Sequence, residues 1–318
     1  MADLRAATDE SGQIMLIAAL TLGVTFVALA LILNSAIFTE NLASRGETTD
    51  ADGVIVYHGD LQRGVGAVVY EENRNASGAS HADVLTRIKT GVGDVNTITL
   101  RRKARQGVIA NVAVASTANG SRIFQTNASR NFTDDSGTEN WTVANDVDRA
   151  RAVSLTVDSS TLPSTCTLLG DCFIVSFSDG SSDWNVSIVR SGIDEIAVEV
   201  DNETGLTQTC GPVTGESVEM DLTAGTVGGV VCRPLDFGDA PSGTFDIEFY
   251  NANEVHGTYS MIVDDPTIAQ SPPVNLSGSG DPSVTPALYN LTLRYHYQTA
   301  VLNATNNVTI TPEEYDGR

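Results

Sequence analysis

The chain has 318 residues, 40 of them acidic and 18 basic, which gives a net charge of −22. Only Lys89 and Lys103 are lysines. This scarcity, combined with the acidic excess, is typical of a surface adapted to high salt, where self-repulsion is screened. A charge this negative excludes general nucleic-acid binding, which needs a basic footprint. Few aromatic residues and many Thr, Val, Ser and Gly favour strands beyond the N-terminal part.

An uncharged stretch covers residues 11–39, and residues 14–33 are apolar except for two threonines. About 20 apolar residues suffice to cross a bilayer as a helix. We therefore expect a transmembrane helix over 12–39, with residues 1–11 in the cytoplasm.

Two further interpretations of this stretch remain open. Ala28-Leu29-Ala30 has the small-x-small form of a signal-peptide cleavage site, although apolar residues follow it directly. Ala19 and Gly23 are four residues apart, a spacing that allows close helix-mediated self-association.

Eleven Asn-x-Ser/Thr sequons follow the apolar stretch and none precedes it. Sequons matter only in exported chains, so we expect the C-terminal part outside the cell. Asn185 and Asn290 each lie between apolar neighbours in alternating runs, which predicts that the asparagines face outward. The candidate glycosylation sites are Asn75, Asn119, Asn127, Asn131, Asn140, Asn185, Asn202, Asn275, Asn290, Asn303 and Asn307.

Four cysteines, Cys166, Cys172, Cys210 and Cys232, allow three pairings. We expect the disulfides Cys166–Cys172 and Cys210–Cys232, because each pair is close in sequence and flanks a turn-rich stretch. Zinc is the alternative, but the chain has no Cys-x-x-Cys motif and no helical His pair. Free thiols suit an oxidising exterior less well.

Residues 40–106 are expected to form a helical stalk and connectors. Apolar residues recur at helical spacing over 50–73, and Ser80 with Asp83 predicts the capped start of a second helix. Glycines weaken the first prediction, and Gly91 with Gly93 favours an early end of the second helix.

From Gly107 onward, apolar and polar residues alternate, which predicts strands. The runs are 153–157, 173–177, 184–188, 196–200, 218–222, 245–249, 259–263, 289–297 and 308–310. Asp179-Gly180 suits a hairpin loop, whereas 115–146 and 270–287 have the composition of exposed loops. The predicted fold class is α+β: an N-terminal transmembrane helix and a helical stalk, followed by a mainly antiparallel β-sandwich-like domain over 107–318.

The sequence contains no recognisable catalytic or metal-binding motif. The four histidines are scattered, and there is no nucleophile elbow, His-Glu-x-x-His motif or phosphate loop. The acidic stretches 134–140 and 179–183 lack the spacing of a calcium loop. A pair of carboxylates for glycoside hydrolysis is recognised by the distance between its two carboxyl groups, which the sequence alone does not give. We expect no enzyme activity, no metal and no cofactor.

The only dense basic cluster is formed by Arg101, Arg102, Lys103 and Arg105. It is interpreted either as a contact for an acidic partner, a glycan or lipid headgroups, or as a solvated link into the β-domain.

Gly12-Gln13 and the segment from Asn34 to Arg45 resemble haloarchaeal single-span surface proteins of unknown function. In architecture, this group is similar to archaeal type IV pilins and archaellins. Those families are cut after a Gly or Ala that follows a basic residue. The resemblance implies processing between Gly12 and Gln13, where Ser11 stands in place of the basic residue.

We therefore expect a membrane-anchored extracellular structural or interaction protein of the archaeal cell envelope, with a pilin-like subunit as one form. The expected location is the cell membrane, with a single span and the C-terminal domain outside. Expected partners are the membrane, further copies through the helix, or envelope proteins, but no nucleic acid. A surface-layer- or partner-binding adhesin-like module and a secreted hydrolase are the alternatives.

Overall fold

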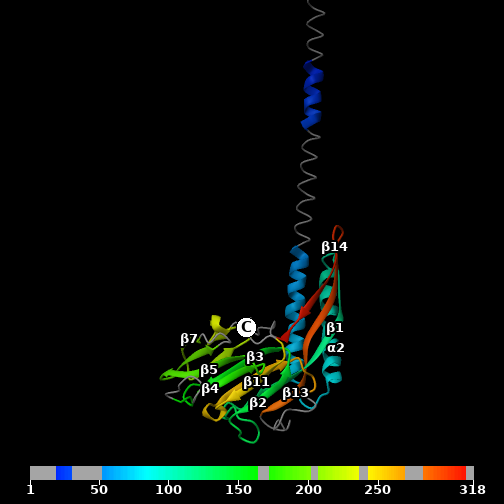
Figure 1. Cartoon of the computed structure of the whole chain (residues 1–318). Coiled ribbons are helices and arrows are strands. Elements are labelled where there is room, and N and C mark those ends of the chain that lie inside the picture. Colours follow the sequence, from blue (N-terminus) through cyan, green and yellow to red (C-terminus); the bar gives the residue numbers. More distant parts are fainter. Residues whose placement is uncertain are drawn as a thin grey trace, which may run out of the picture.

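The computed structural model describes residues 19–30, 52–163, 172–201, 207–235, 243–268 and 282–312. Within these residues, fourteen strands form two antiparallel sheets (Figure 1). In spatial order, the eight-stranded sheet consists of β10 (Val230–Val231), β9 (Thr226–Val227), β8 (Ser217–Asp221), β3 (Ala150–Asp158), β12 (Gly257–Val263), β1 (Ile109–Gln125), β13 (Ser283–Gln298) and β14 (Asn303–Ile310). The six-stranded sheet consists of β2 (Trp141–Val147), β11 (Phe245–Tyr250), β4 (Phe173–Ser178), β5 (Asp183–Gly192), β6 (Glu195–Asp201) and β7 (Thr207–Thr214).

The two sheets share one hydrophobic core, to which β-strands of both contribute buried side chains. Phe249 on β11 meets Tyr259 on β12 with the ring planes perpendicular and the centroids 5.1 Å apart. Trp184 is fully buried in the same core. Short 3₁₀ turns at Arg233–Leu235 (η1) and Ala252–Glu254 (η3) add Leu235 and Ala252. We call residues 115–287 the head.

Two helices cover the remaining part of the eight-stranded sheet. One spans residues 52–74, and the other is α2 (His81–Ala104). Helix α2 begins with the predicted capping box, in which Asp83 N donates to Ser80 Oγ and Ser80 N donates to Asp83 Oδ2. Their apolar faces pack on β1, β13 and β14 and form a second core. We call residues 52–114 and 288–310 the stem.

The long strands β1 and β13 belong to both cores (Figure 1). Val112 and Leu293 lie in the stem core, whereas Ile123 and Val284 lie in the head core. The β1–β13 ladder shifts register twice between these parts, at residues 114/116 and 118/119. Such bulges bend and twist a strand locally, so one pair of strands serves two differently oriented cores. Strand β1 thus begins in the stem core and ends in the head core.

Both helices continue through glycines that were expected to weaken or end them, and two of these glycines, Gly64 and Gly91, lie at the helix–helix contact. A Cβ on Gly91 would lie 2.5 Å from Val68 Cγ1, and one on Gly64 would lie 3.6 Å from Val95 Cγ1. The missing side chains let the two helices approach each other closely. The expectation that α2 ends early at Gly91 and Gly93 is wrong.

The predicted fold class is also wrong. With 46% of its residues in strands, the chain is mainly antiparallel β. Within the described residues, no helix is both long enough and apolar enough to cross a membrane. Of the expected span 12–39, only residues 19–30 are described; they are helical and exposed.

All nine predicted strand runs coincide with strands, and Asp179-Gly180 connects β4 to β5 as expected. The prediction of a loop over 115–146 is wrong, because β1 extends to Gln125 and β2 begins at Trp141. The loop predicted over 270–287 is wrong at its end, where β13 begins at Ser283. Strand β7 has no counterpart in the prediction.

Candidate functional site

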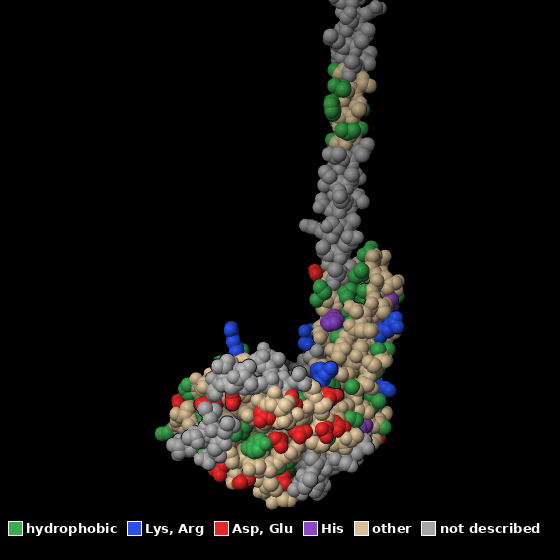
Figure 2. Space-filling view, in the orientation of Figure 1, with side chains coloured by type: hydrophobic (Ala, Val, Ile, Leu, Met, Phe, Trp, Pro, Cys, Tyr) green, Lys and Arg blue, Asp and Glu red, His purple; other side chains and the backbone are tan. Residues whose placement is uncertain are grey.

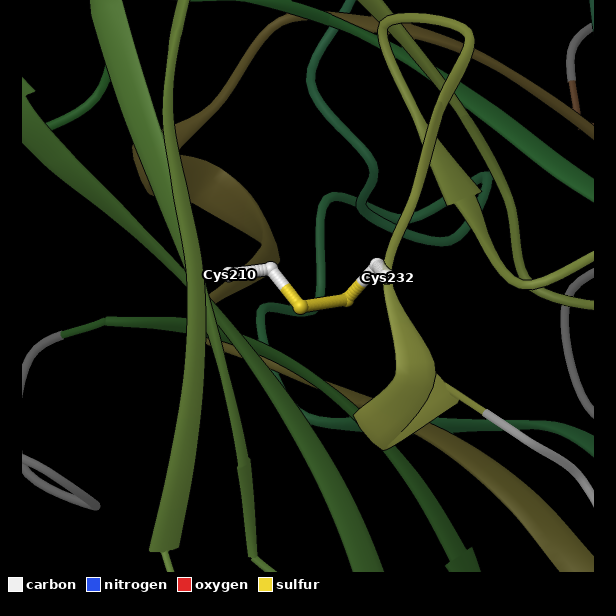
Figure 3. The surroundings of a disulfide bond; sticks show 2 residues. All are labelled: Cys210 and Cys232. Atoms are coloured by element: carbon white, nitrogen blue, oxygen red, sulfur yellow. A yellow bond between two sulfur atoms is a disulfide. The ribbon is translucent and has the colours of Figure 1, made fainter.

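The Cys210–Cys232 disulfide is confirmed, with an S–S distance of 2.05 Å (Figure 3). Cys210 lies on β7, at the edge of the six-stranded sheet, and Cys232 directly follows β10, at the edge of the eight-stranded sheet. The bond therefore ties the two sheets together at one side of the head. Cys172 is also disulfide-bonded, and Cys166 lies outside the described residues.

None of the sequon asparagines within the described residues is buried. Asn185 is half-buried between the fully buried Trp184 and Val186, and Asn290 is half-buried between the buried Tyr289 and Leu291, as the alternation predicts. Exposed are Asn75, Asn119, Asn127, Asn140, Asn303 and Asn307, and Asn131 is half-buried. Asn202, Asn275 and the predicted processing site at Gly12 and Gln13 lie outside the described residues. Glycan occupancy stays a prediction.

In the two acidic stretches considered for calcium, a carboxylate accepts hydrogen bonds from groups of its own turn. Asp134 Oδ1 accepts from the backbone N–H groups of Ser136 and Thr138 at 2.9 and 2.7 Å. Asp179 Oδ1 accepts from the hydroxyl and N–H of Ser181, and these bonds lower the pKa of the Asp179 carboxyl. Within the described residues, no three His, Cys, Asp or Glu side chains are placed to hold a metal.

A polar hollow of about 340 Å³ on the head is lined by Asp158, Asp194 and Glu216. Asp158 Oδ1 accepts from the N–H and hydroxyl of Ser160 at 2.9 and 2.7 Å. One of the three carboxylates is thus already bound within its own turn. The hollow offers carboxylates but no defined acid and base pair.

The predicted basic cluster forms the last turn of α2 and the residue after it. Cations there stabilise the negative end of the helix dipole. Lys103 is buried, and its Nζ lies 5.9 Å from the Tyr57 ring centroid and 5.7 Å from that of Tyr297. Lys103 is therefore part of the stem core, whereas Arg101, Arg102 and Arg105 are exposed.

The end of the stem away from the head exposes apolar side chains (Figure 2). The helix over 52–74 begins there, α2 ends there, β1 begins there, and the β13–β14 turn closes it. The exposed residues, which we call the stem tip, are Ile55, Val56, Ile98, Leu100, Ile109 and Val301. They are between 42% and 70% exposed. The exposed arginines of the basic cluster belong to the same end.

Charge is divided unequally between stem and head. The stem carries nine basic and six acidic residues, a net charge of +3, whereas the head carries six basic and 25 acidic residues, a net charge of −19. Figure 2 shows the acidic side chains spread over the head and basic ones along the stem. The molecule therefore has two ends of opposite electrostatic character, held on the shared strands β1 and β13.

An arginine lies buried where the stem meets the head. Arg122 on β1 is 7% exposed, and its neighbours across the ladder are Ile262 on β12 and Thr285 on β13. Its Nε donates to Ser260 Oγ at 3.0 Å, and its guanidinium lies 4.0 Å from the Phe124 ring centroid. Sequence reasoning missed this residue because it falls in the segment interpreted as a loop.

Arg122 feels a second positive charge, that of Arg74. No ion pair within the described residues includes it. Burial first, and then the charge of Arg74, lower the pKa of the Arg122 guanidinium to about 10, against the opposing effect of Tyr70. Taking a charge out of water costs several kcal/mol, roughly, whereas contact with an aromatic ring stabilises it by about 1–2 kcal/mol. The buried charge is therefore only partly compensated by the protein itself.

Comparison of the chain with protein-family models, with curated proteins and with solved structures finds no match.

Proposed function

We propose that this protein is an exported structural or interaction protein of the cell envelope, which acts through its two unlike ends rather than through catalysis. The observation that carries the proposal is the pairing of a basic, apolar-tipped stem with a strongly acidic head on one continuous pair of strands. Because β1 and β13 run through both parts, a contact made at the stem also orients the head.

The chemistry of the head supports an exterior location. Its disulfide at Cys210–Cys232 suits an oxidising compartment. Sequon asparagines lie on its surface, where a glycan fits without disturbing the core. Its dense carboxylates keep it hydrated and soluble at high salt.

The chemistry of the stem tip supports a protein partner. Contiguous exposed apolar side chains on a folded protein commonly mark an interaction site. The surrounding arginines favour an acidic partner through electrostatic complementarity. The head of another copy has such a charge.

In-cell cross-linking of the full-length chain tests this function. A stem-tip variant, Ile55→Ser with Ile98→Ser and Ile109→Ser, is compared with a head variant that changes equally exposed residues, Ile193→Ser with Val231→Ser. We expect the stem-tip variant to lose most cross-links within the envelope fraction, and the head variant to keep them.

The identity of the cross-linked partner distinguishes a subunit of an assembly from a module that binds another protein. Links between stem and head peptides of two copies indicate an assembled subunit, and links to a different envelope protein indicate a binding module. Equal cross-linking in wild type and both variants would show that the stem tip is not the contact. Protection of the head from protease added to intact cells, with digestion after lysis, would contradict export.

A further inference from the structure

We propose that Arg122, Arg74 and Thr285 form a binding site for a small oxyanion, a sulfate, phosphate or carboxylate group, at the junction of stem and head. The inference is independent of the proposed function, because it rests on the buried groups of the junction and not on the stem tip or the acidic surface.

The site is built on the face of the eight-stranded sheet opposite the head core. Ile123 points into that core, so Arg122 points the other way. Ser260 and Phe124 hold the guanidinium on two sides, one through Nε and one through the ring face. These contacts leave both terminal nitrogens without an acceptor in the described part of the chain. A planar guanidinium fixed in this way presents a two-pronged edge to an oxyanion.

Thr285 supplies a second group for the same ligand. It is 7% exposed and lies directly opposite Arg122 in the β1–β13 ladder, where facing Cβ atoms are about 5 Å apart. Its Oγ1 is buried and has no hydrogen-bond partner within the residues described. A buried hydroxyl that donates to nothing is uncommon in folded proteins, and an oxyanion bound by Arg122 would accept from it.

Arg74 completes the positive environment from the helix side. It stacks on Tyr70, with its Cζ 5.3 Å from the ring centroid, and donates to the Tyr70 hydroxyl at 2.6 Å. Arg74 is exposed, and its positive charge acts on Arg122. A buried charge without a partner is costly, and a second positive charge acting on it makes a bound anion more favourable.

Calorimetric titration of the full-length chain with sodium sulfate tests the site, in potassium chloride buffer at fixed ionic strength. We expect saturable binding to the wild-type chain and none to Arg122→Met. Arg294→Met is the matched control, because Arg294 is an exposed arginine on β13, and it is expected to bind sulfate as the wild type does. A parallel titration with sodium acetate separates a carboxylate site from one for tetrahedral anions.

Thr285→Val keeps the test valid if Arg122→Met fails to fold. This substitution preserves the shape of the side chain, and we expect about tenfold weaker sulfate binding with an unchanged near-UV circular dichroism spectrum. Arg122→Met should also melt at the same or a higher temperature than wild type without sulfate, because a buried unpaired charge is removed. Absence of saturable binding of either anion to the wild type, or wild-type affinity in both variants, would overturn the proposal.

Discussion

The side chain of Asn73 takes the place of a missing neighbouring strand beside Leu288. Its Nδ2 donates to the Leu288 carbonyl at 3.0 Å, and its Oδ1 accepts from the Leu288 N–H at 2.8 Å. Strand β14 ends at Ile310, opposite Leu291, so among the described residues this edge of β13 has no strand partner farther toward the head. Asn73 is 1% exposed, and it fixes the end of the helix over 52–74 to the point where the two cores meet.

Replacing Asn73 should therefore cost more than a surface contact would. Asn73→Ala leaves the Leu288 N–H and carbonyl buried without partners, and each such group costs about 1–3 kcal/mol. We expect the free energy of unfolding to fall by about 2–4 kcal/mol in chemical denaturation. Asn73→Asp is the matched variant: it keeps an acceptor for the N–H but places a charge against the Leu288 carbonyl, so it should not restore stability. An unchanged unfolding midpoint in Asn73→Ala would contradict this role.

Two glycines of α2 should respond to alanine with opposite signs. A Cβ on Gly93 meets nothing within 4 Å, so Gly93→Ala should stabilise the protein by about 0.5–1 kcal/mol through helix propensity. A Cβ on Gly91 would lie 2.5 Å from Val68 Cγ1, and the cost of overpacking should outweigh the gain in propensity, for a net loss of about 1 kcal/mol. Thermal melting of the two variants beside wild type measures the difference. Stabilisation by both would mean that the helices do not touch at Gly91.

Local patterns predicted the strands whose one face lies in a core. Val153, Leu155 and Val157 alternate with polar residues because β3 has one buried face, and they are all buried as expected. The same rule failed for β1 between residues 113 and 120, where small and polar residues replace the alternation. That stretch passes from one core to the other through two register shifts, so its burial is set by partners on β13 and not by its own period.

Local sequence patterns could not predict the candidate anion site either, because its burial is also set by distant strands. Arg122 becomes buried only because β12 and β13, more than 130 residues later in the chain, flank it with Ser260 and Thr285. No spacing rule joins these three residues in sequence. The cysteine pairing, by contrast, was predictable, because residues 210 and 232 are separated by only 22 positions and enclose turn-forming glycines.

Reduction of the Cys210–Cys232 bond should loosen the joined edges of the two sheets. Closing a loop of 22 residues removes chain entropy from the unfolded state, by about 3 kcal/mol on the usual model. We expect Cys210→Ser with Cys232→Ser to lower the free energy of unfolding by about that amount while the stem keeps its helical circular dichroism signal. Equal stability of the double variant and the oxidised wild type would show that the bond adds nothing to the fold.

Alkaline pH should weaken the stem through Tyr57. This side chain is fully buried against Tyr295, and its hydroxyl has no hydrogen-bond partner among the described residues. Burial, and then the charge of Tyr295, raise the pKa of Tyr57 to about 12.

The fold thus favours the neutral phenol of Tyr57, whereas in the unfolded chain this phenol ionises near pH 10. The contribution of the neutral phenol to the free energy of unfolding is complete below pH 10 and disappears as the pH rises through 12. Its full size is about 3 kcal/mol, since the pKa rises by about two units and each unit corresponds to about 1.4 kcal/mol.

Tyr57→Phe isolates this contribution from that of every other group that titrates at high pH. Phenylalanine keeps the apolar ring and removes the unpartnered hydroxyl, so the variant should be as stable as wild type, or slightly more stable, at pH 7. Between pH 10 and pH 12, its free energy of unfolding should fall less than that of wild type, by about 2 kcal/mol. Denaturant titrations of both proteins at pH 7, 10 and 11.5 give the comparison. Parallel pH profiles would mean that Tyr57 ionises in the folded protein as easily as in the unfolded chain, and that the stem core around it is open to water.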